Sequence, residues 1–300
     1  QMCIRDSSVD SIQTQPGHPG EPVGRNANRI GGAKFTLNGV TYELAKNSAE
    51  VNNLHSGPDY YRDRIWDAEV EETALGTTIT FGLHSPDGDQ GYPGNADITV
   101  SYTLTPDNCL KLDYHMVSDA DTIANFTNHV YFNLGGYKSG SALDQKVWID
   151  ADYFTATDAN SIPTGELVAV KGTPMDFTEM KPIGRDIQED YQALKYGNGY
   201  DHNWALNHPA GELSLSAKAE DEKTGRTMEV YTDLPGVQFY TANSLKTERG
   251  KNHAVYTPRC GYCFETQYFP DAINKPEFAS PVIKAGEEYK TTTIYKFGVK

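Results

Sequence analysis

Two stretches, Ile98-Thr-Val-Ser-Tyr-Thr-Leu104 and Leu110-Lys-Leu-Asp-Tyr-His-Met116, place an apolar side chain at every second position. Successive side chains of a β-strand point to opposite faces of its sheet, so this period of two indicates strands with one buried face. The same pattern recurs at Ile79, Phe81 and Leu83. The middle of the chain is therefore predicted to form a β-sheet.

Further strands are predicted on both sides of this region. Asn38-Gly39 separates two alternating runs, and Asn-Gly supplies the positive φ angles of a two-residue hairpin turn. Only Glu179–Lys195 is a candidate helix, and Pro182 and Gly184 interrupt its start. Later strands are expected at Val147–Ile149, Leu213–Leu215, Met228–Tyr231, Val237–Tyr240, Tyr262–Tyr268 and Thr293–Val299.

These elements lack the alternation of strands and helices that a parallel sheet requires. The chain is therefore predicted to be all-β, as a large antiparallel β-sandwich. Residues 1–22, rich in Ser, Gln, Pro and Gly, have no hydrophobic period and are expected to be loose. A single domain is expected at residues 23–300, because no later shift in composition marks a boundary.

The charge balance limits the possible partners. The chain carries 26 Lys and Arg against 41 Asp and Glu, a formal net charge of −15. Such a chain repels nucleic acid and an anionic membrane surface, so a small or neutral partner is expected. No apolar stretch approaches the roughly 20 residues of a membrane-spanning helix, and no signal-peptide pattern is visible. A cytoplasmic location is therefore expected.

Of the four cysteines, only Cys260 and Cys263 lie close together in the sequence. A zinc site requires further Cys or His ligands at short spacing, and none follows. The surrounding segment is typical of a strand, in which an odd separation places the two thiols on opposite faces. No metal site is predicted.

A polar face in Thr122–Leu134 is a first candidate for a functional site. Alternation places His129 and Tyr131 on one face of this predicted strand, and Phe126 and Phe132 on the other. The apolar face is expected to enter the core. The alternative for the polar face is an ordinary solvated surface with a hydrogen-bonded histidine.

Two further segments carry polar residues beside aromatic ones. Glu265 lies between the aromatic residues of a predicted strand, where burial would raise the pKa of a carboxyl group. The alternative is a surface strand whose glutamate points outward. The segment Gly199–Trp204, which contains Asp201, is a polar cluster or equally a turn.

Seven motifs, in this order along the chain, resemble the aldose 1-epimerase (galactose mutarotase) family. The resemblance runs from about residue 22 to the end, and it implies a large antiparallel β-sandwich with an open sugar-binding cleft on one sheet. The motifs are Gly24-Arg-Asn-Ala-Asn-Arg-Ile30, Asn53-Leu-His-Ser-Gly57, Ser85-Pro-Asp-Gly-Asp-Gln-Gly-Tyr-Pro-Gly94, Thr127-Asn-His-Val-Tyr-Phe-Asn-Leu134, Tyr200-Asp-His-Asn203, Pro235-Gly-Val-Gln-Phe-Tyr-Thr241, and Glu265-Thr-Gln with Pro270-Asp-Ala-Ile-Asn274.

The resemblance implies a role for individual residues. Glu265 corresponds to the general base, His129 to the general acid and His55 to a second cleft histidine. Positions that hold the sugar correspond to Asn28, Arg29, Tyr131, Asp201 and Gln238. Opening a pyranose removes the proton of the anomeric hydroxyl and delivers one to the ring oxygen, so a carboxylate and an imidazolium must face each other across C1–O5. The reaction has no net redox change, and no cofactor is expected.

The family has several strands before the motif that begins at Gly24, whereas Gln1–Ser8 resembles none of them. The domain is therefore expected to lack its N-terminal strands. The predicted function is interconversion of the anomers of a free aldohexose such as galactose or glucose, a small neutral monosaccharide. The alternatives are a non-catalytic carbohydrate-binding protein and a hexose-6-phosphate 1-epimerase, which would require extra Arg or Lys at the cleft rim.

Overall fold

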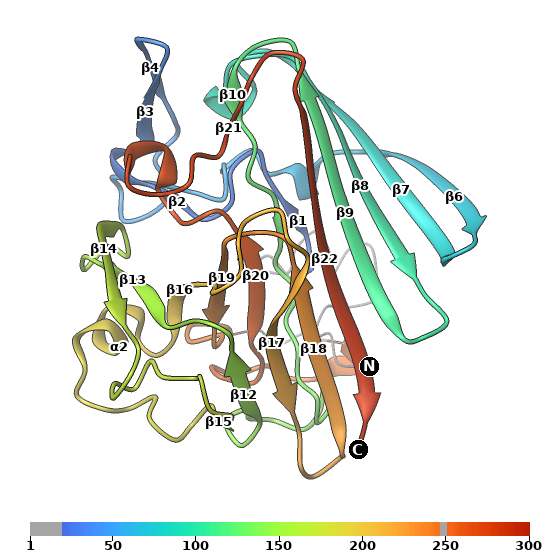
Figure 1. Cartoon of the computed structure of the whole chain (residues 1–300), viewed down its shortest axis with the longest axis vertical. Helices are drawn as coiled ribbons and strands as arrows, with labels where there is room; N and C mark the ends of the chain where they lie inside the picture. The colour runs from blue at the N-terminus through green and yellow to red at the C-terminus, as the bar shows by residue number, and fades with distance from the viewer. Residues whose placement is uncertain (1–19, 247–250) are drawn as a thin grey trace.

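The computed structural model describes residues 20–246 and 251–300 (Figure 1). Strands dominate it, as predicted, and the largest sheet has nine antiparallel strands. Their order across the sheet is β15 (Lys181–Pro182), β12 (Lys146–Ile149), β17 (Ser214–Glu220), β18 (Arg226–Thr232), β22 (Glu288–Val299), β9 (Cys109–Ser118), β8 (Ala96–Leu104), β7 (Gly76–Ser85) and β6 (Asp67–Thr73).

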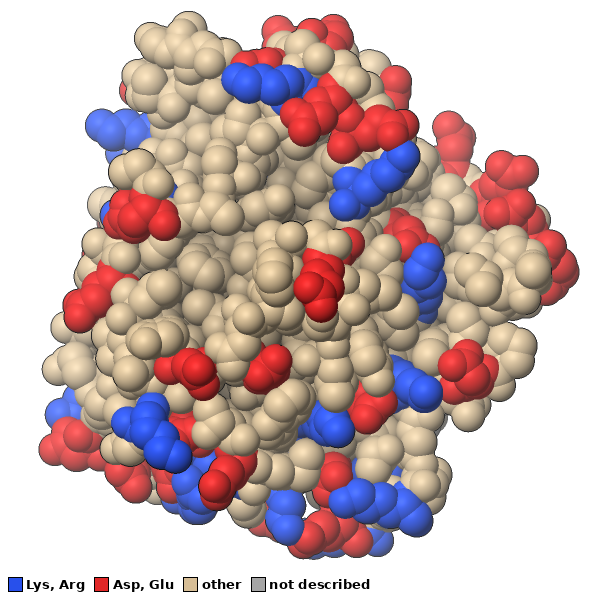
Figure 2. Space-filling model, viewed as in Figure 1, with Lys and Arg blue, Asp and Glu red and all other residues tan. Residues whose placement is uncertain are grey.

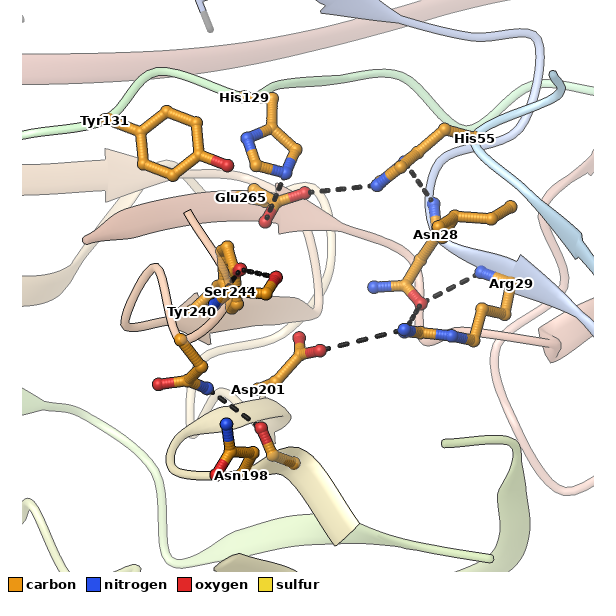
Figure 3. Close-up of a pocket in the computed structure, with 13 residues that line it drawn as sticks. Asn28, Arg29, His55, His129, Tyr131, Asn198, Asp201, Tyr240, Ser244 and Glu265 are labelled. Atoms are coloured by element: carbon orange, nitrogen blue, oxygen red, sulfur yellow. Dashed lines mark hydrogen bonds and ion pairs between the residues drawn. The ribbon is translucent and has the colours of Figure 1, made fainter. Parts of the chain in front are cut away.

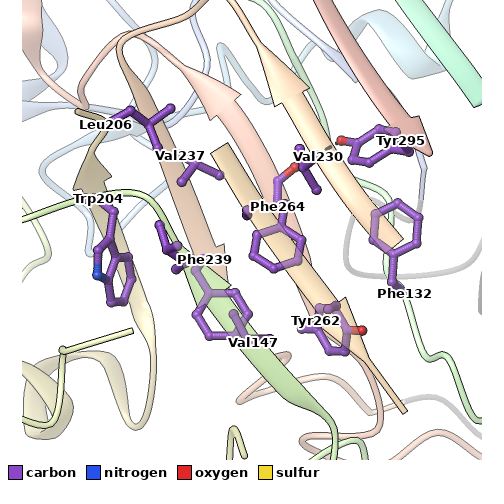
Figure 4. Close-up of a cluster of buried hydrophobic side chains, with 14 of the residues drawn as sticks. Phe132, Val147, Trp204, Leu206, Val230, Val237, Phe239, Tyr262, Phe264 and Tyr295 are labelled. Carbon is purple, nitrogen blue, oxygen red and sulfur yellow. Dashed lines mark hydrogen bonds between the residues drawn. The ribbon is translucent and has the colours of Figure 1, made fainter. Parts of the chain in front are cut away.

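A second antiparallel sheet of five strands packs on one half of the large sheet (Figures 1 and 4). Its inward side chains meet those of β12, β17, β18 and β22, so that the two sheets form a sandwich. The strand order is β14 (Pro163–Ala169), β13 (Tyr153–Thr157), β16 (Asp201–Ala205), β19 (Gly236–Tyr240) and β20 (Cys263–Gln267).

Short elements complete the described part of the chain. Four two-stranded ribbons are formed by β1 (Pro22–Val23) with β11 (Thr127–Asn128), β2 (Arg29–Ile30) with β5 (Asn53–Leu54), β3 (Lys34–Leu37) with β4 (Val40–Glu43), and β10 (Thr122–Ile123) with β21 (Val282–Ile283). The helices are α2 (Gln192–Gly197) and the single 3₁₀ turns Gly31–Ala33, Tyr61–Asp63, Asp89–Gly91, Lys251–His253 and Ala272–Asn274. Among the described residues, no helix has the length and apolar character needed to cross a membrane.

The core between the two sheets is rich in aromatic side chains (Figure 4). The rings of Phe239 and Phe264 stack with their centroids 5.1 Å apart, and the Tyr295 hydroxyl donates to the carbonyl of Phe264 at 3.0 Å, which joins the sheets. Trp204 is fully buried beside them. Each such side chain contributes about 1.5–3 kcal/mol through burial.

The predicted period of two is confirmed in the register of β8 and β9. Val100 faces Tyr114 and Tyr102 faces Leu112 across the pair. Strands are also present at the later predicted places, in β12, β17, β18, β19, β20 and β22, although Leu213 precedes β17, and Tyr262 and Tyr268 flank β20. The hairpin at Asn38-Gly39 joins β3 to β4, with φ of 51° and 79° at these two residues.

Three expectations differ from the structure. Thr122–Leu134 is not one strand: only β10 and β11, of two residues each, are extended pairs in it. The helix begins at Gln192, later than expected, and the region before it forms the short strand β15 followed by turns, because Pro182 and Gly184 disfavour helix there. Cys260 precedes β20 instead of lying within it, so Cys260 and Cys263 pack in the same buried cluster.

Of the segment predicted to be loose, residues 1–19 lie outside the described residues. Pro22 belongs to β1, where it is paired with Asn128 of β11. The ribbon formed by β1 and β11 leads directly to His129, so the beginning of the described chain supports a segment that carries a predicted site residue.

Candidate functional site

The candidate site lies on the outer face of the five-stranded sheet (Figure 3). Residues directly opposite each other on antiparallel neighbours share a face. Gln238 of β19 is paired with Glu265 of β20, and Tyr240 of β19 with Asp201 of β16. Because these residues alternate with core residues such as Phe239, the pattern that buries the aromatic core also presents the polar side chains outward.

His129 and Tyr131 reach the site from the segment that follows β11. The N–H of His129 donates to the carbonyl of Glu21 at 3.0 Å, and Phe132 exchanges two backbone hydrogen bonds with Tyr262. These bonds fix the segment at both ends, and the rings of His129 and Tyr131 lie with their centroids 5.0 Å apart. Both side chains line the cleft, as predicted, but both are buried, so the alternative of a solvated face is wrong.

Asn28, Arg29 and His55 come from the β2–β5 ribbon. The N–H of His55 donates to the carbonyl of Asn28 at 2.9 Å, and the N–H of Asn28 donates to Nδ1 of His55 at 3.1 Å. Asn28 and His55 have φ of 61° and 54°, a left-handed conformation in which Asn and His are enriched. These two hydrogen bonds hold the His55 ring so that its Nε2 points toward Glu265 (Figure 3).

Glu265 is 2% exposed, so the alternative of an outward-pointing glutamate is wrong. Its Oε1 lies 3.6 Å from Nε2 of His129, and its Oε2 lies 4.0 Å from Nε2 of His55. Burial raises the pKa of Glu265 well above its usual value; Asp201 raises it further, and Arg29 opposes the shift. A carboxylate with a raised pKa is a stronger proton acceptor than an ordinary glutamate, as general-base catalysis requires.

The hydrogen bond at His55 also decides whether these groups suit a metal ion. One ligand atom each of His55, His129 and Glu265 lies within 4.8 Å of the others, a separation that one divalent ion could span. However, Nδ1 of His55 accepts from the backbone N–H of Asn28, so the neutral ring carries its proton on Nε2. An Nε2–H group donates a hydrogen bond and has no lone pair for a metal. The arrangement therefore suits hydrogen bonding and proton transfer better than metal binding.

Arg29 and Asp201 form one wall of the site. Nη2 of Arg29 lies 3.7 Å from Oδ2 of Asp201, and both side chains are partly exposed. Nε2 of Gln238 donates to Oδ1 of Asp201 at 2.7 Å, and Oδ1 of Asn28 accepts from the N–H of Arg29 at 2.9 Å. Oδ1 of Asn28 also accepts from Nη1 of Arg29 at 3.4 Å, so the side-chain amides of Asn28 and Gln238 hold the cation and the carboxylate of this wall.

These elements enclose a cleft of about 270 Å³. Gln238 is the one predicted site residue that does not line it; Gln238 is 3% exposed and contacts Asp201 from beneath. The predicted residues that the structure brings together in the lining are Asn28, Arg29, His55, His129, Tyr131, Asp201 and Glu265.

Sequence reasoning missed several residues of the cleft. Tyr240 lies two residues after Gln238 on β19, so the same alternation would have placed it on the outer face. Its hydroxyl lies 3.1 Å from Oγ of Ser244. Leu54, Gly197, Asn198, Asn243 and Ser244 also line the cleft, and all but Leu54 lie in loops or at a helix end, where the sequence carries no periodic signal.

Comparison with known proteins agrees with this geometry. The family model described as Aldose 1-epimerase matches residues 2–296. The chain belongs to the aldose 1-epimerase family. The galactose mutarotase of Bos taurus is 42% identical to this epimerase family member over 289 residues, which cover 96% of this chain and 81% of the bovine protein.

A bacterial relative and a solved structure extend the comparison. The aldose 1-epimerase of Haemophilus influenzae is 38% identical over 304 residues, covering 96% of this chain and 83% of that protein. The solved structure of an aldose epimerase homologue from C. elegans has a TM-score of 0.88 at 24% identity, covering 99% of this chain and 88% of that one. The predicted galactose mutarotase-like sandwich is thereby confirmed for this epimerase family member.

Proposed function

We propose that this protein interconverts the α and β anomers of a free aldohexose such as galactose or glucose. The observation that carries the proposal is that the two carboxylate oxygens of Glu265 face Nε2 of His129 and Nε2 of His55 in one cleft. Opening a pyranose requires a base at the anomeric hydroxyl and an acid at the ring oxygen, both within hydrogen-bond reach of one sugar. Relatives named galactose mutarotase and aldose 1-epimerase support the same reaction.

In the proposed reaction, Glu265 accepts the proton of the anomeric hydroxyl while the C1–O5 bond breaks and C1=O1 forms. His129, as an imidazolium, donates its Nε2 proton to O5. After rotation about C1–C2, O5 attacks the other face of C1, its proton returns to Nε2, and Glu265 returns its proton to O1. Each proton transfer contributes about 10²–10⁴-fold to the rate, and no electrons are exchanged with a cofactor.

The remaining residues are proposed to hold the sugar. Nε2–H of His55 is a donor of fixed direction, because Nδ1 accepts from Asn28. Arg29 donates to hydroxyls and Asp201 accepts from them, while Gln238 keeps Asp201 in place. Tyr131 contributes an apolar ring face to the cleft.

The charge of the cleft favours a neutral sugar over a sugar phosphate. Among the described residues that line the cleft, Arg29 is the only Lys or Arg, and it is already paired with Asp201. On the face shown in Figure 2, Lys and Arg are interspersed with Asp and Glu and form no broad basic area. A hexose 6-phosphate would meet few cations to bind its phosphate group. Competition between galactose and a hexose 6-phosphate tests this, and stronger inhibition by the phosphate would favour the alternative.

Polarimetry of freshly dissolved α-galactose with the purified protein tests the main proposal. We expect faster equilibration than in buffer, and a loss of about 10²–10⁴-fold in kcat for Glu265→Gln. Glu43→Gln, an exposed glutamate on β4, is the matched control and should leave the rate unchanged. Equilibration no faster than in buffer would overturn the proposal; saturable galactose binding in that case would identify a non-catalytic binding protein.

We also infer a cytoplasmic location. Cys109, Cys260 and Cys263 all carry free thiols, as is usual in a reducing compartment. Cell fractionation followed by immunodetection of the protein tests the inference. Recovery in an extracellular or periplasmic fraction would contradict it.

A further inference from the structure

A thiol lies against the second ring nitrogen of His129. Sγ of Cys263 is 3.5 Å from Nδ1 of His129, on the side of the ring away from Glu265. Cys263 and Glu265 are two residues apart on β20, so both side chains project from the same face of the strand. One strand therefore contacts both nitrogens of the histidine, with a carboxylate at Nε2 and a thiol at Nδ1.

We propose that Cys263 is a positioning residue for His129. Its sulfur accepts a hydrogen bond from Nδ1–H of His129, which leaves the Nε2 proton as the one exchanged with the sugar. This inference rests on the proposed function. When Glu265 is ionised and His129 is an imidazolium, Nδ1–H points at the sulfur. When the Nε2 proton has moved to O5, the neutral ring keeps Nδ1–H, and the contact with sulfur is unchanged. Cys263 thus holds one tautomer through both halves of the reaction.

Sulfur is a weak hydrogen-bond acceptor, and this weakness suits the proposed role of Cys263. A carboxylate at Nδ1 would form a charge-assisted hydrogen bond, which stabilises the imidazolium and opposes release of its Nε2 proton. A thiol is a weak acceptor, so it fixes the ring while stabilising the imidazolium less than a carboxylate would. Cys263 is fully buried in a cluster with Tyr131, Tyr256 and Cys260, and this packing keeps the sulfur in place.

The groups that face His129 come from several elements. Because a hydrogen bond to Nδ1–H favours the charged ring, loss of the sulfur should make His129 a stronger acid and move the alkaline limb of kcat to lower pH. The other side chains around the ring keep their identity when Cys263 is replaced, so a shift of the pH profile reports on the loss of the sulfur. The titratable side chains in contact with the ring or beside it are His55, Tyr131, Tyr240, Cys263 and Glu265.

Kinetics of Cys263→Ala and Cys263→Ser test the proposal. For Cys263→Ala we expect kcat to fall about tenfold, as for loss of one hydrogen bond, with KM nearly unchanged. The alkaline limb should move to lower pH. Cys263→Ser, whose hydroxyl can also accept, should recover most of the lost kcat. Cys260→Ala removes a buried thiol from the same cluster and serves as the control for packing.

Nitrogen-15 NMR of the His129 ring gives a readout that does not depend on activity. In the wild type the neutral ring should carry its proton on Nδ1, and in Cys263→Ala the two tautomers should mix. If the wild type does not accelerate mutarotation, the proposed function fails while this signature still reports on Cys263. An unchanged tautomer and an unchanged pH profile in Cys263→Ala, or an equal loss of kcat in Cys260→Ala, would overturn the proposal.

Discussion

Nε2 of His129 lies 3.6 Å from Oε1 of Glu265, and this distance makes the two side chains a coupled acid–base pair. One proton placed between them gives either a carboxylate with an imidazolium or a carboxylic acid with a neutral imidazole. Both are the states that the proposed reaction requires before and after ring opening. We expect the two side chains to titrate as a coupled pair, so that a substitution which changes the proton affinity of either residue moves a limb of the pH–rate profile.

Glu265→Gln should stabilise the protein at neutral and alkaline pH while it abolishes most activity. Burial raises the pKa of Glu265 in the folded state, so the folded protein binds this proton more tightly than the unfolded chain does. The stabilising contribution of Glu265 is therefore complete below the pKa that Glu265 has in the unfolded chain. It falls as the pH rises toward the higher pKa of Glu265 in the folded protein, and it stays lost above that value. Glutamine has no charge to desolvate and avoids that loss.

Thermal unfolding at two pH values measures the effect. We expect a higher Tm for Glu265→Gln than for the wild type at pH 8, by about 2–4 °C for each kcal/mol gained, and a difference that narrows near pH 4. Glu43→Gln should show no such pH-dependent difference, because Glu43 is exposed. A Tm below that of the wild type at pH 8 would contradict the prediction.

Asp201→Asn should change both sugar binding and the pH profile. The charge of Asp201 contributes to the raised pKa of Glu265, so its removal should lower that pKa and move the acidic limb of kcat/KM to lower pH. Loss of a charged acceptor should also raise KM about tenfold or more. Gln238 can still donate to the asparagine oxygen, which limits structural change. Polarimetric rates across pH 4–8 test both effects. An acidic limb at the same pH as in the wild type would contradict the predicted effect on the pKa of Glu265.

Period-two patterning predicted the sheets well because alternation is set by local geometry. The same alternation explains why neighbouring residues of the polar segment around Asp201 point to opposite faces of the sheet. Asp201 faces the cleft, whereas His202, one residue later, points into the core, where burial lowers its pKa to about 4. Its ring lies 6.1 Å from that of Phe154, so His202 is a neutral core residue.

The path of the segment around His129 could not be predicted in the same way. Its backbone hydrogen bonds go to Glu21 on one side and, through Phe132, to Tyr262 on the other. Both partners are distant in sequence, so no local pattern reports them. The contact between Cys263 and His129 could not be predicted either, because it exists only after the fold has formed.

His55→Asn isolates the contribution of the imidazole at this position. Asparagine adopts positive φ readily, so the backbone at φ 54° should tolerate it, whereas the Nε2–H donor facing Glu265 is lost. We expect kcat/KM to fall about 10–100-fold, as for loss of one hydrogen bond to a charged group. His84→Asn, at an exposed histidine on β7, should have no effect. Activity of His55→Asn within error of the wild type would exclude a role for His55.

Phe239→Ala tests how far the site depends on the core beneath it. Phe239 is fully buried and stacks on Phe264, and it lies between Gln238, which contacts Asp201, and Tyr240, which lines the cleft. Its truncation should destabilise the protein by about 3–5 kcal/mol, because the transfer energy of the ring is lost and a cavity remains.

The kinetic consequence separates packing from chemistry. A looser β19 should let Gln238 and therefore Asp201 shift, so that KM rises in Phe239→Ala even at temperatures where the variant is fully folded. Tyr153→Ala, at a half-exposed aromatic residue on β13 of the same sheet, should cost far less stability and leave KM unchanged. Denaturant unfolding measures the stability of both variants, and polarimetry measures their KM. An unaltered KM in folded Phe239→Ala would mean that the loops, and not the sheet, keep the cleft residues in position.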